Sequence, residues 1–117
     1  MRVSVLGVAA LLASTSLVSA ADIMTGYYGN TLVATTAESQ VHFHYRADHS
    51  FDASGTDAAG PIAFKGLWSL NKMGALCRIR DTAPPKTDPF CEDWSAHAVG
   101  DSWEIHGVAF TLIEGIQ

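Results

Sequence analysis

Basic residues are scarce in this chain of 117 residues. Seven Lys and Arg side chains stand against twelve Asp and Glu side chains, which gives a net charge of −5 with the histidines neutral. The basic residues are scattered and form no cluster along the sequence. Nucleic acids and anionic membrane surfaces are bound through a positive patch, so the sequence predicts neither of them as a partner.

Long apolar runs are also missing after the first residues. At the start of the chain, Arg2 precedes the apolar run Val3–Leu12, and small and polar residues then lead to Ala20. This order of charge, apolar stretch and small-residue cleavage site is that of a secretory signal. It is too short to span a membrane, which takes about 20 apolar residues. We predict a signal peptide over residues 1–20, no membrane span after its removal, and a periplasmic or secreted location.

The predicted mature chain covers residues 21–117 and has room for a single domain with one modest core. Loss of Arg2 leaves six basic residues against twelve acidic ones, a net charge of −6. Cysteine is limited to Cys77 and Cys91. Because thiols oxidise outside the cytoplasm, this pair predicts one disulfide. A crosslink closing a loop of this size stabilises a small domain by about 3 kcal/mol.

The common catalytic motifs are absent. The chain has no G-x-S-x-G, no H-E-x-x-H and no phosphate-binding G-x-x-x-x-G-K-[ST]. His44 beside Asp48 or Asp52 could form an acid-base dyad in the mouth of a barrel. Because Asp and His near a turn more often act as turn and capping residues, we favour a non-catalytic protein and assign no catalytic residue.

What the sequence does contain is a series of short apolar or β-branched runs separated by Gly, Asn, Asp and Pro, without a helical stripe. This pattern is typical of antiparallel strands joined by turns. We predict strands over residues 31–36, 40–46, 62–70, 75–80, 91–99, 102–106 and 108–114, a short strand from Phe51, and loops over 53–61 and 81–90. The fold class is all-β: an antiparallel meander of six to eight strands, curled into a small barrel that protects its edges.

Five histidines stand out among the polar residues. In the predicted strand 40–46, period-two alternation sends the apolar side chains to the core and places His42 and His44 together on the opposite face. His49 lies just past the next turn, and imidazole suits copper and zinc. One hypothesis is a copper or zinc site at these three histidines, completed by a further polar side chain from His97, His106, Asp48 or Glu92. The other is a solvated polar strand face, because H-x-H spacing is common by chance.

Aromatic side chains are the second set of candidates. A barrel of about eight strands can hold one small ligand, and apolar ligand sites are lined by such rings. The candidate ligand residues are Trp68, Trp94, Trp103, Phe43 and Tyr45, with Phe64 and Phe110 beside them. The same rings could instead serve only to fill the core of a small domain. Tyr27 and Tyr28 precede the regular strands and either plug one end of the fold or stay exposed for a partner.

Several segments resemble a loose group of small exported proteobacterial proteins of unassigned function, which have a lipocalin-like β-barrel or half-barrel build. The segments that carry the resemblance are Gly26–Leu32 (GYYGNTL), His42–Phe51 (HFHYRADHSF), Gly66–Leu70 (GLWSL) followed by Cys77, and Cys91 leading into Val99–Trp103 (VGDSW). Each is a pattern of strand, turn and cysteine. The resemblance therefore implies a fold and a compartment, and it carries over no catalytic residue.

A second group, the small secreted β-barrel inhibitors of metalloproteases, is similar in size, signal and single disulfide. Its disulfide is expected to close an earlier and longer loop, so this resemblance supplies only an alternative. An inhibitor of this kind should present the segment Ala21–Tyr28 as a free arm. Our leading hypothesis is a binding module for a small apolar ligand or a protein partner, followed by a metal binder, an inhibitor and an enzyme.

Overall fold

The protein forms one curved antiparallel sheet. The computed structural model describes residues 23–117, so the predicted signal peptide lies outside the described residues. The elements are a short 3₁₀ helix η1 (Thr25–Tyr27) and the strands β1 (Thr31–Thr35), β2 (Gln40–Tyr45), β3 (Ser50–Asp57), β4 (Gly60–Leu70), β5 (Leu76–Arg80), β6 (Phe90–Glu92), β7 (Ser102–Ile105) and β8 (Val108–Ile113). The all-β fold class is confirmed.

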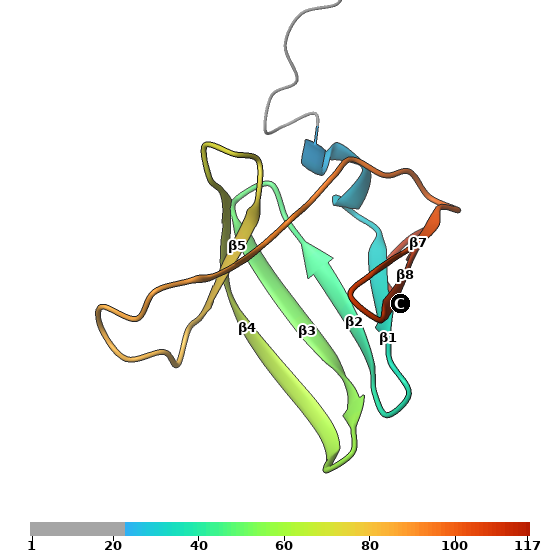
Figure 1. The fold of residues 1–117 in the computed structure, drawn as a ribbon, viewed down its shortest axis with the longest axis horizontal. Coiled ribbons are helices and arrows are strands. Elements are labelled where there is room, and N and C mark those ends of the chain that lie inside the picture. Colours follow the sequence, from blue (N-terminus) through green and yellow to red (C-terminus); the bar gives the residue numbers. More distant parts are fainter. Residues whose placement is uncertain (1–22) are drawn as a thin grey trace, which may run out of the picture.

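The sheet is an open half-barrel. Its strand order is β6-β5-β4-β3-β2-β1-β8-β7, and all of these pairs are antiparallel. Consecutive strands pair from β1 to β6, and β8 returns beside β1. The described strands β6 and β7 are the two edges, and the sheet curls between them (Figure 1). The predicted meander is therefore present, and it is curved without being closed.

The segment between β6 and β7 crosses the concave side of the sheet (Figure 1). Trp94, in this segment, packs against Tyr45 and Phe110, with ring centroids 6.1 and 6.2 Å away. The backbone of this segment is held to η1, because the Tyr27 hydroxyl donates a hydrogen bond of 2.9 Å to the carbonyl oxygen of Ser95. These contacts draw the chain out of the sheet after β6. The predicted strand 91–99 is consequently wrong beyond Glu92.

The predicted loop over residues 53–61 is also wrong, because β3 and β4 run through it as a long hairpin. Gly55 pairs with Val41 on one side and with Ile62 on the other. A Cβ atom at this position would lie only 2.0 Å from the carbonyl oxygen of Gln40, so glycine allows the close approach of β2. Pairing with β2 and β4 gives hydrogen-bond partners to the backbone groups of β3, which its small side chains do not cover.

Nine buried residues form the core, and most of them are large. The core cluster consists of Met24, Tyr27, Leu32, Tyr45, Phe51, Trp68, Leu76, Phe110 and Leu112. Met24 and Tyr27 are fully or almost fully buried, so η1 closes one end of the half-barrel, at the top of Figure 1. The described part of the N-terminal segment is therefore packed at these residues and does not form the free arm that the inhibitor alternative needs.

The predicted disulfide between Cys77 and Cys91 is confirmed. The two residues are direct partners in the pairing of β5 with β6, and 14 positions separate them in the sequence. The crosslink therefore fastens a strand of three residues to the edge of the sheet. Within residues 23–117, no helix has the length and apolar character needed to cross a membrane.

Candidate functional site

The strand register divides the side chains between a concave and a convex face. Residues that are directly opposite each other on neighbouring strands share a face. Phe43 pairs with Ala53, which pairs with Phe64. Two residues further along β4, and so on the same face, Gly66 pairs with Arg80. These residues share the concave face with the buried Trp68 and Tyr45. The sheet thus turns both phenylalanines and an arginine toward its interior.

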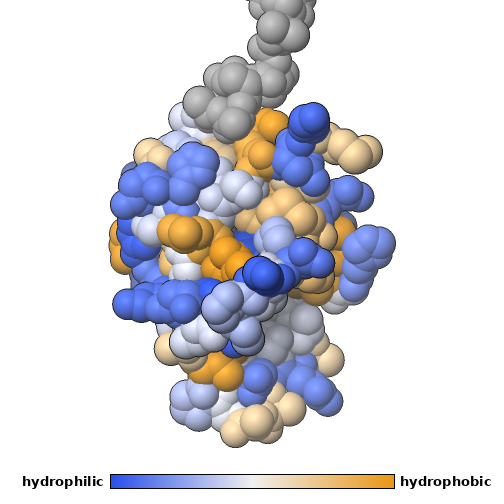
Figure 2. Space-filling view, turned by 90° about the vertical axis from the view of Figure 1, so that its left-hand side faces the viewer, coloured by the Kyte–Doolittle hydropathy of each residue, from blue (hydrophilic) through white to orange (hydrophobic). Residues whose placement is uncertain are grey.

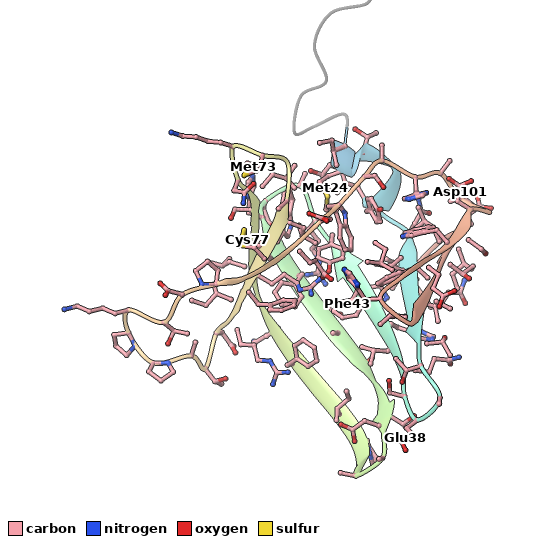
Figure 3. All side chains as sticks on the ribbon, viewed as in Figure 1. Met24, Glu38, Phe43, Met73, Cys77 and Asp101 are labelled. Carbon is pink, nitrogen blue, oxygen red and sulfur yellow. A yellow bond between two sulfur atoms is a disulfide. The ribbon has the colours of Figure 1, made fainter. Side chains whose placement is uncertain are left out.

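A cavity of about 210 Å³ opens on this concave face. We call it the aromatic cup, and its lining residues are Phe43, Phe51, Phe64, Phe90, Arg78 and Arg80. Phe64 stands edge-on to Phe43 and to Phe51, with ring centroids 6.1 Å apart in both pairs. In Figure 3, Phe43 lies among the side chains gathered inside the curve of the sheet. The volume suits a ligand of about one aromatic ring, because an apolar cavity of about 150 Å³ can hold benzene.

Arg78 is a fixed part of the wall of the cup. Its guanidinium donates a hydrogen bond of 2.8 Å to the Tyr45 hydroxyl and forms an ion pair with Glu92. The same group lies over the rings of Phe43 and Phe90, 5.3 and 5.7 Å from their centroids. Burial opposes its charge, yet Tyr45 and Glu92 raise the pKa of Arg78 above its usual value. The charge of Arg78 is thus already matched by a carboxylate of the protein.

Arg80 has a different environment at the rim of the cup. The centre of its guanidinium lies 3.9 Å from the centroid of the Phe64 ring, which is within the range of a cation–π contact. Its side chain is exposed. Among the described residues, no carboxylate forms an ion pair with Arg80. The cup therefore carries one guanidinium whose charge is neutralised by a carboxylate, that of Arg78, and one whose charge is not, that of Arg80.

Arg80 also borders a larger hollow of about 550 Å³, on the other side of β3, β4 and β5. The charged residues lining that hollow are Arg46, Asp52, Lys65, Arg80 and Asp81, and its apolar lining includes Leu67 and Ile79. Leu67 is 59% exposed. Figure 2 shows apolar surface interrupting a largely hydrophilic face on the side of the molecule that faces left in Figure 1. The cup and this hollow are therefore two candidate sites that share Arg80 and Phe51.

The three histidines of the metal hypothesis have different neighbours, and His42 is paired on β2 with Val33 and Ser54. Nδ1 of His44 lies 2.8 Å from Oδ1 of Asp52, and the Nε2 atom of His44 is buried without a hydrogen-bond partner. Nδ1 of His49 lies 3.0 Å from the carbonyl oxygen of Trp68, whose ring stacks on the imidazole. Over residues 23–117, no group of three or more His, Cys, Asp and Glu side chains is placed to hold a metal ion. The site at His42, His44 and His49 stays a prediction.

The pairing of His44 with Asp52 is the dyad considered from the sequence. Asp52 is also bound by Arg46. Partial burial opposes the carboxylate, but the hydrogen bonds from His44 and Arg46 outweigh it and lower the pKa of Asp52. His44 lies on the convex face, since its neighbour Phe43 points into the cup. The dyad is therefore an ion-pair network on the outside of the sheet, away from the concave site.

A second polar network was not anticipated from the sequence. Oγ of Ser95 lies 3.1 Å from Nε2 of His97, and Nδ1 of His97 lies 3.1 Å from Oδ2 of Asp101. This is the hydrogen-bond order of a catalytic triad. Ser95 is exposed, and none of the three residues lines the cup. Asp101 also accepts the backbone N–H of Ala98, and these bonds lower its pKa. The His97 ring stacks 3.4 Å from that of Trp103, so the network holds the crossing segment in place.

The five predicted ligand residues have different positions relative to the cup. Phe43 lines it, and Tyr45 lies beneath it as the hydrogen-bond partner of Arg78. Trp68 and Trp94 pack in or against the core, and Trp103 stacks between His97 and Phe110. Sequence reasoning missed Phe51, Phe90, Arg78 and Arg80 as lining residues. The alternation that puts the two arginines opposite Cys77 was the available signal for them.

The comparisons with known proteins gave no match: no family model, no curated protein and no solved structure matched the chain. The resemblance to small exported half-barrel proteins stays a prediction. The function therefore has to be argued from the residues of the site itself.

Proposed function

We propose that this domain is a non-catalytic binding module that holds a small apolar ligand in the aromatic cup. The observation that carries the proposal is the convergence of four phenylalanine rings around one cavity of about 210 Å³. Apolar ligands are held in concave sites with aromatic walls and few polar groups. The cup is small by the standard of such sites, so the ligand is expected to contain about one ring.

Phe90 is the wall residue whose exposure supports a binding role most directly. It is 64% exposed, although it is a large apolar residue on a strand that a disulfide fixes in place. Apolar surface that is in contact with water is stabilised when a ligand covers it. A bound ligand would cover the inner side of this ring. The disulfide also supports the export of the protein to the periplasm or beyond, because such crosslinks persist in oxidising compartments.

The metal alternative is less well supported by the same side chains. Nδ1 of His44 is engaged by Asp52, and its Nε2 atom is buried. To bind the ring, a metal ion would have to displace Asp52 from Nδ1 or reach the buried Nε2 atom. A protein partner, the other form of the binding hypothesis, could use Phe90 and the edge strands, but no feature of the cup selects it over a small molecule.

The proposal is tested by NMR titration of the oxidised mature protein with toluene and p-cresol, and separately with Zn²⁺ and Cu²⁺. We expect both apolar probes to shift the backbone amides around Phe43, Phe64 and Phe90. Phe90→Ala should weaken binding at least fivefold. Leu67→Ala, which truncates an exposed apolar side chain on the opposite face, is the matched control and should leave binding unchanged.

Two results would overturn the proposal. One is the absence of amide shifts with either probe up to millimolar concentration. The other is binding that Leu67→Ala weakens and Phe90→Ala does not, which would place the ligand in the outer hollow. A stoichiometric response to copper or zinc that a variant with both His42→Ala and His44→Ala loses would instead support the metal alternative.

A further inference from the structure

We propose that the ligand of the cup is a small monocarboxylate, whose apolar part lies among the phenylalanine rings and whose carboxylate is bound by Arg80. The inference rests on the proposed function, because it specifies the chemical class of the ligand in the same cavity. It is carried by the contrast between the two arginines in the wall, of which one has a carboxylate partner and the other has none among the described residues.

The cup carries a net positive charge. Arg78 and Arg80 both line it, and Glu92 neutralises Arg78 through a partly buried ion pair. One positive charge therefore remains at the cavity, in a chain whose net charge is −5. An aromatic cavity that retains one uncompensated cation selects against cationic ligands and favours anionic ones.

The hydrogen-bond donors of Arg80 are available to a ligand. Its guanidinium lies over the Phe64 ring, 3.9 Å from the centroid. Such stacking uses the flat face of the guanidinium, whereas its five N–H groups point outward in the plane of the group. No hydrogen bond from these donors to another described side chain is present. The planar fork is the geometry that binds a carboxylate through two parallel hydrogen bonds.

The size of the cup and the position of Arg80 at its rim set the orientation of the ligand. Arg80 is exposed at the rim, whereas Phe43 and Phe51 form the deeper wall. A ligand of about one ring would place its apolar part inward and its carboxylate outward at the rim. Phenylacetate has these dimensions, and it is the probe of the proposed class. Its neutral isostere phenylacetamide keeps the shape and loses the charge.

The experiment is calorimetric titration of the oxidised protein at pH 7 with phenylacetate, phenylacetamide, phenethylammonium and toluene. We expect phenylacetate to bind at least tenfold more tightly than phenylacetamide, and phenethylammonium to bind most weakly. Arg80→Gln should abolish the preference for the carboxylate while toluene binding is kept, and Arg80→Lys should retain part of the preference.

Lys72→Gln is the matched control, since it removes the same charge from the turn between β4 and β5, and it should leave the preference unchanged. Phe90→Ala separates the cup from the outer hollow that Arg80 also borders, because Phe90 lines the cup and does not line that hollow. Unfolding midpoints of the variants show whether each one is folded.

The outcomes distinguish this inference from the proposed function. Equal binding of phenylacetate and phenylacetamide, with toluene bound, would overturn the carboxylate assignment and leave the apolar binding function in place. A carboxylate preference that survives Arg80→Gln would also overturn it. If neither toluene nor any of the other three probes binds, the proposed function fails and this inference fails with it.

Discussion

Cys77 and Cys91 face each other directly across β5 and β6, one residue away from the pairing of Arg78 with Phe90. The crosslink therefore sits behind the wall of the aromatic cup. β6 has only three residues, and two of them serve the cup: Phe90 lines it and Glu92 holds Arg78. The disulfide stabilises the fold and also positions the site.

Reduction of this disulfide, or a variant with both Cys77→Ala and Cys91→Ala, should lower the free energy of unfolding by about 3 kcal/mol, because it frees a loop of this length in the unfolded chain. It should also weaken toluene binding, since β6 then keeps only its short pairing with β5. Urea unfolding and NMR titration measure the two effects. Unchanged binding in a variant that is less stable would show that β6 stays in place without the crosslink.

Tyr45 limits the stability of the folded protein at alkaline pH. Burial raises the pKa of its hydroxyl to about 12, and the opposing effect of Arg78 is smaller. An unfolded tyrosine ionises near pH 10, so the folded state holds this proton more tightly. The contribution of Tyr45 to stability should be constant below about pH 10 and fall as the pH rises from 10 towards 12, by up to about 1.4 kcal/mol for each unit of the difference.

The measurement that checks this is the absorbance of phenolate recorded together with near-ultraviolet circular dichroism along an alkaline titration. Burial also raises the pKa of Tyr27, so most phenolate should appear in one cooperative step with the loss of tertiary signal. Tyr45→Phe should move that step to higher pH, and Tyr28→Phe, which removes a less buried hydroxyl whose pKa burial also raises, should move it less. Ionisation of Tyr45 well before unfolding would contradict the assignment.

Gly66 lets β4 and β5 approach each other at the position that carries Arg80. A Cβ atom at residue 66 would lie 2.0 Å from the carbonyl oxygen of Ile79, and Gly66 pairs directly with Arg80. Gly66→Ala must therefore move the backbone of β5, at a cost of about 1–3 kcal/mol. We expect a lower urea midpoint and weaker binding of phenylacetate. Ala63→Gly, on the same strand, tests whether the loss comes from the added methyl group or from any change in β4.

The sequence predicted much of the fold because alternation and turn residues are local signals. The strand 40–46 placed Phe43 and Tyr45 on the inner face correctly, and the cysteine pair fixed the edge of the sheet. The strand through residues 53–57 was missed, since its small side chains give no apolar period and its stability comes from pairing on both sides. Such pairing depends on partners far along the chain, which local patterns do not encode.

The cup was predicted only in part for a related reason. Phe43 and Phe64 were recognised as candidate lining residues, but Phe90 follows a segment with three prolines and reaches the cup only through the pairing of β6. The two arginines were not among the candidate lining residues, because charged residues usually face water. In the folded protein they lie against aromatic rings on the concave face.

Glu92 keeps Arg78 from acting as a second anion site. Glu92→Gln should leave the guanidinium of Arg78 with the Tyr45 hydroxyl as its neutral partner, and so raise the positive charge of the cup. We expect phenylacetate to bind about threefold more tightly than in the unmodified protein, which is the effect of one partly screened charge. The variant should also lose about 2 kcal/mol of stability, because a partly buried ion pair is broken.

Glu104→Gln is the matched control for this variant, since it removes the same charge from an exposed position on β7. Calorimetry with phenylacetate and phenylacetamide separates the gain in charge from any change in the shape of the cup. If both probes gain equally, the cup has widened. If phenylacetate binding weakens while the protein stays folded, Glu92 helps to bind the ligand, and the division of roles between the two arginines is wrong.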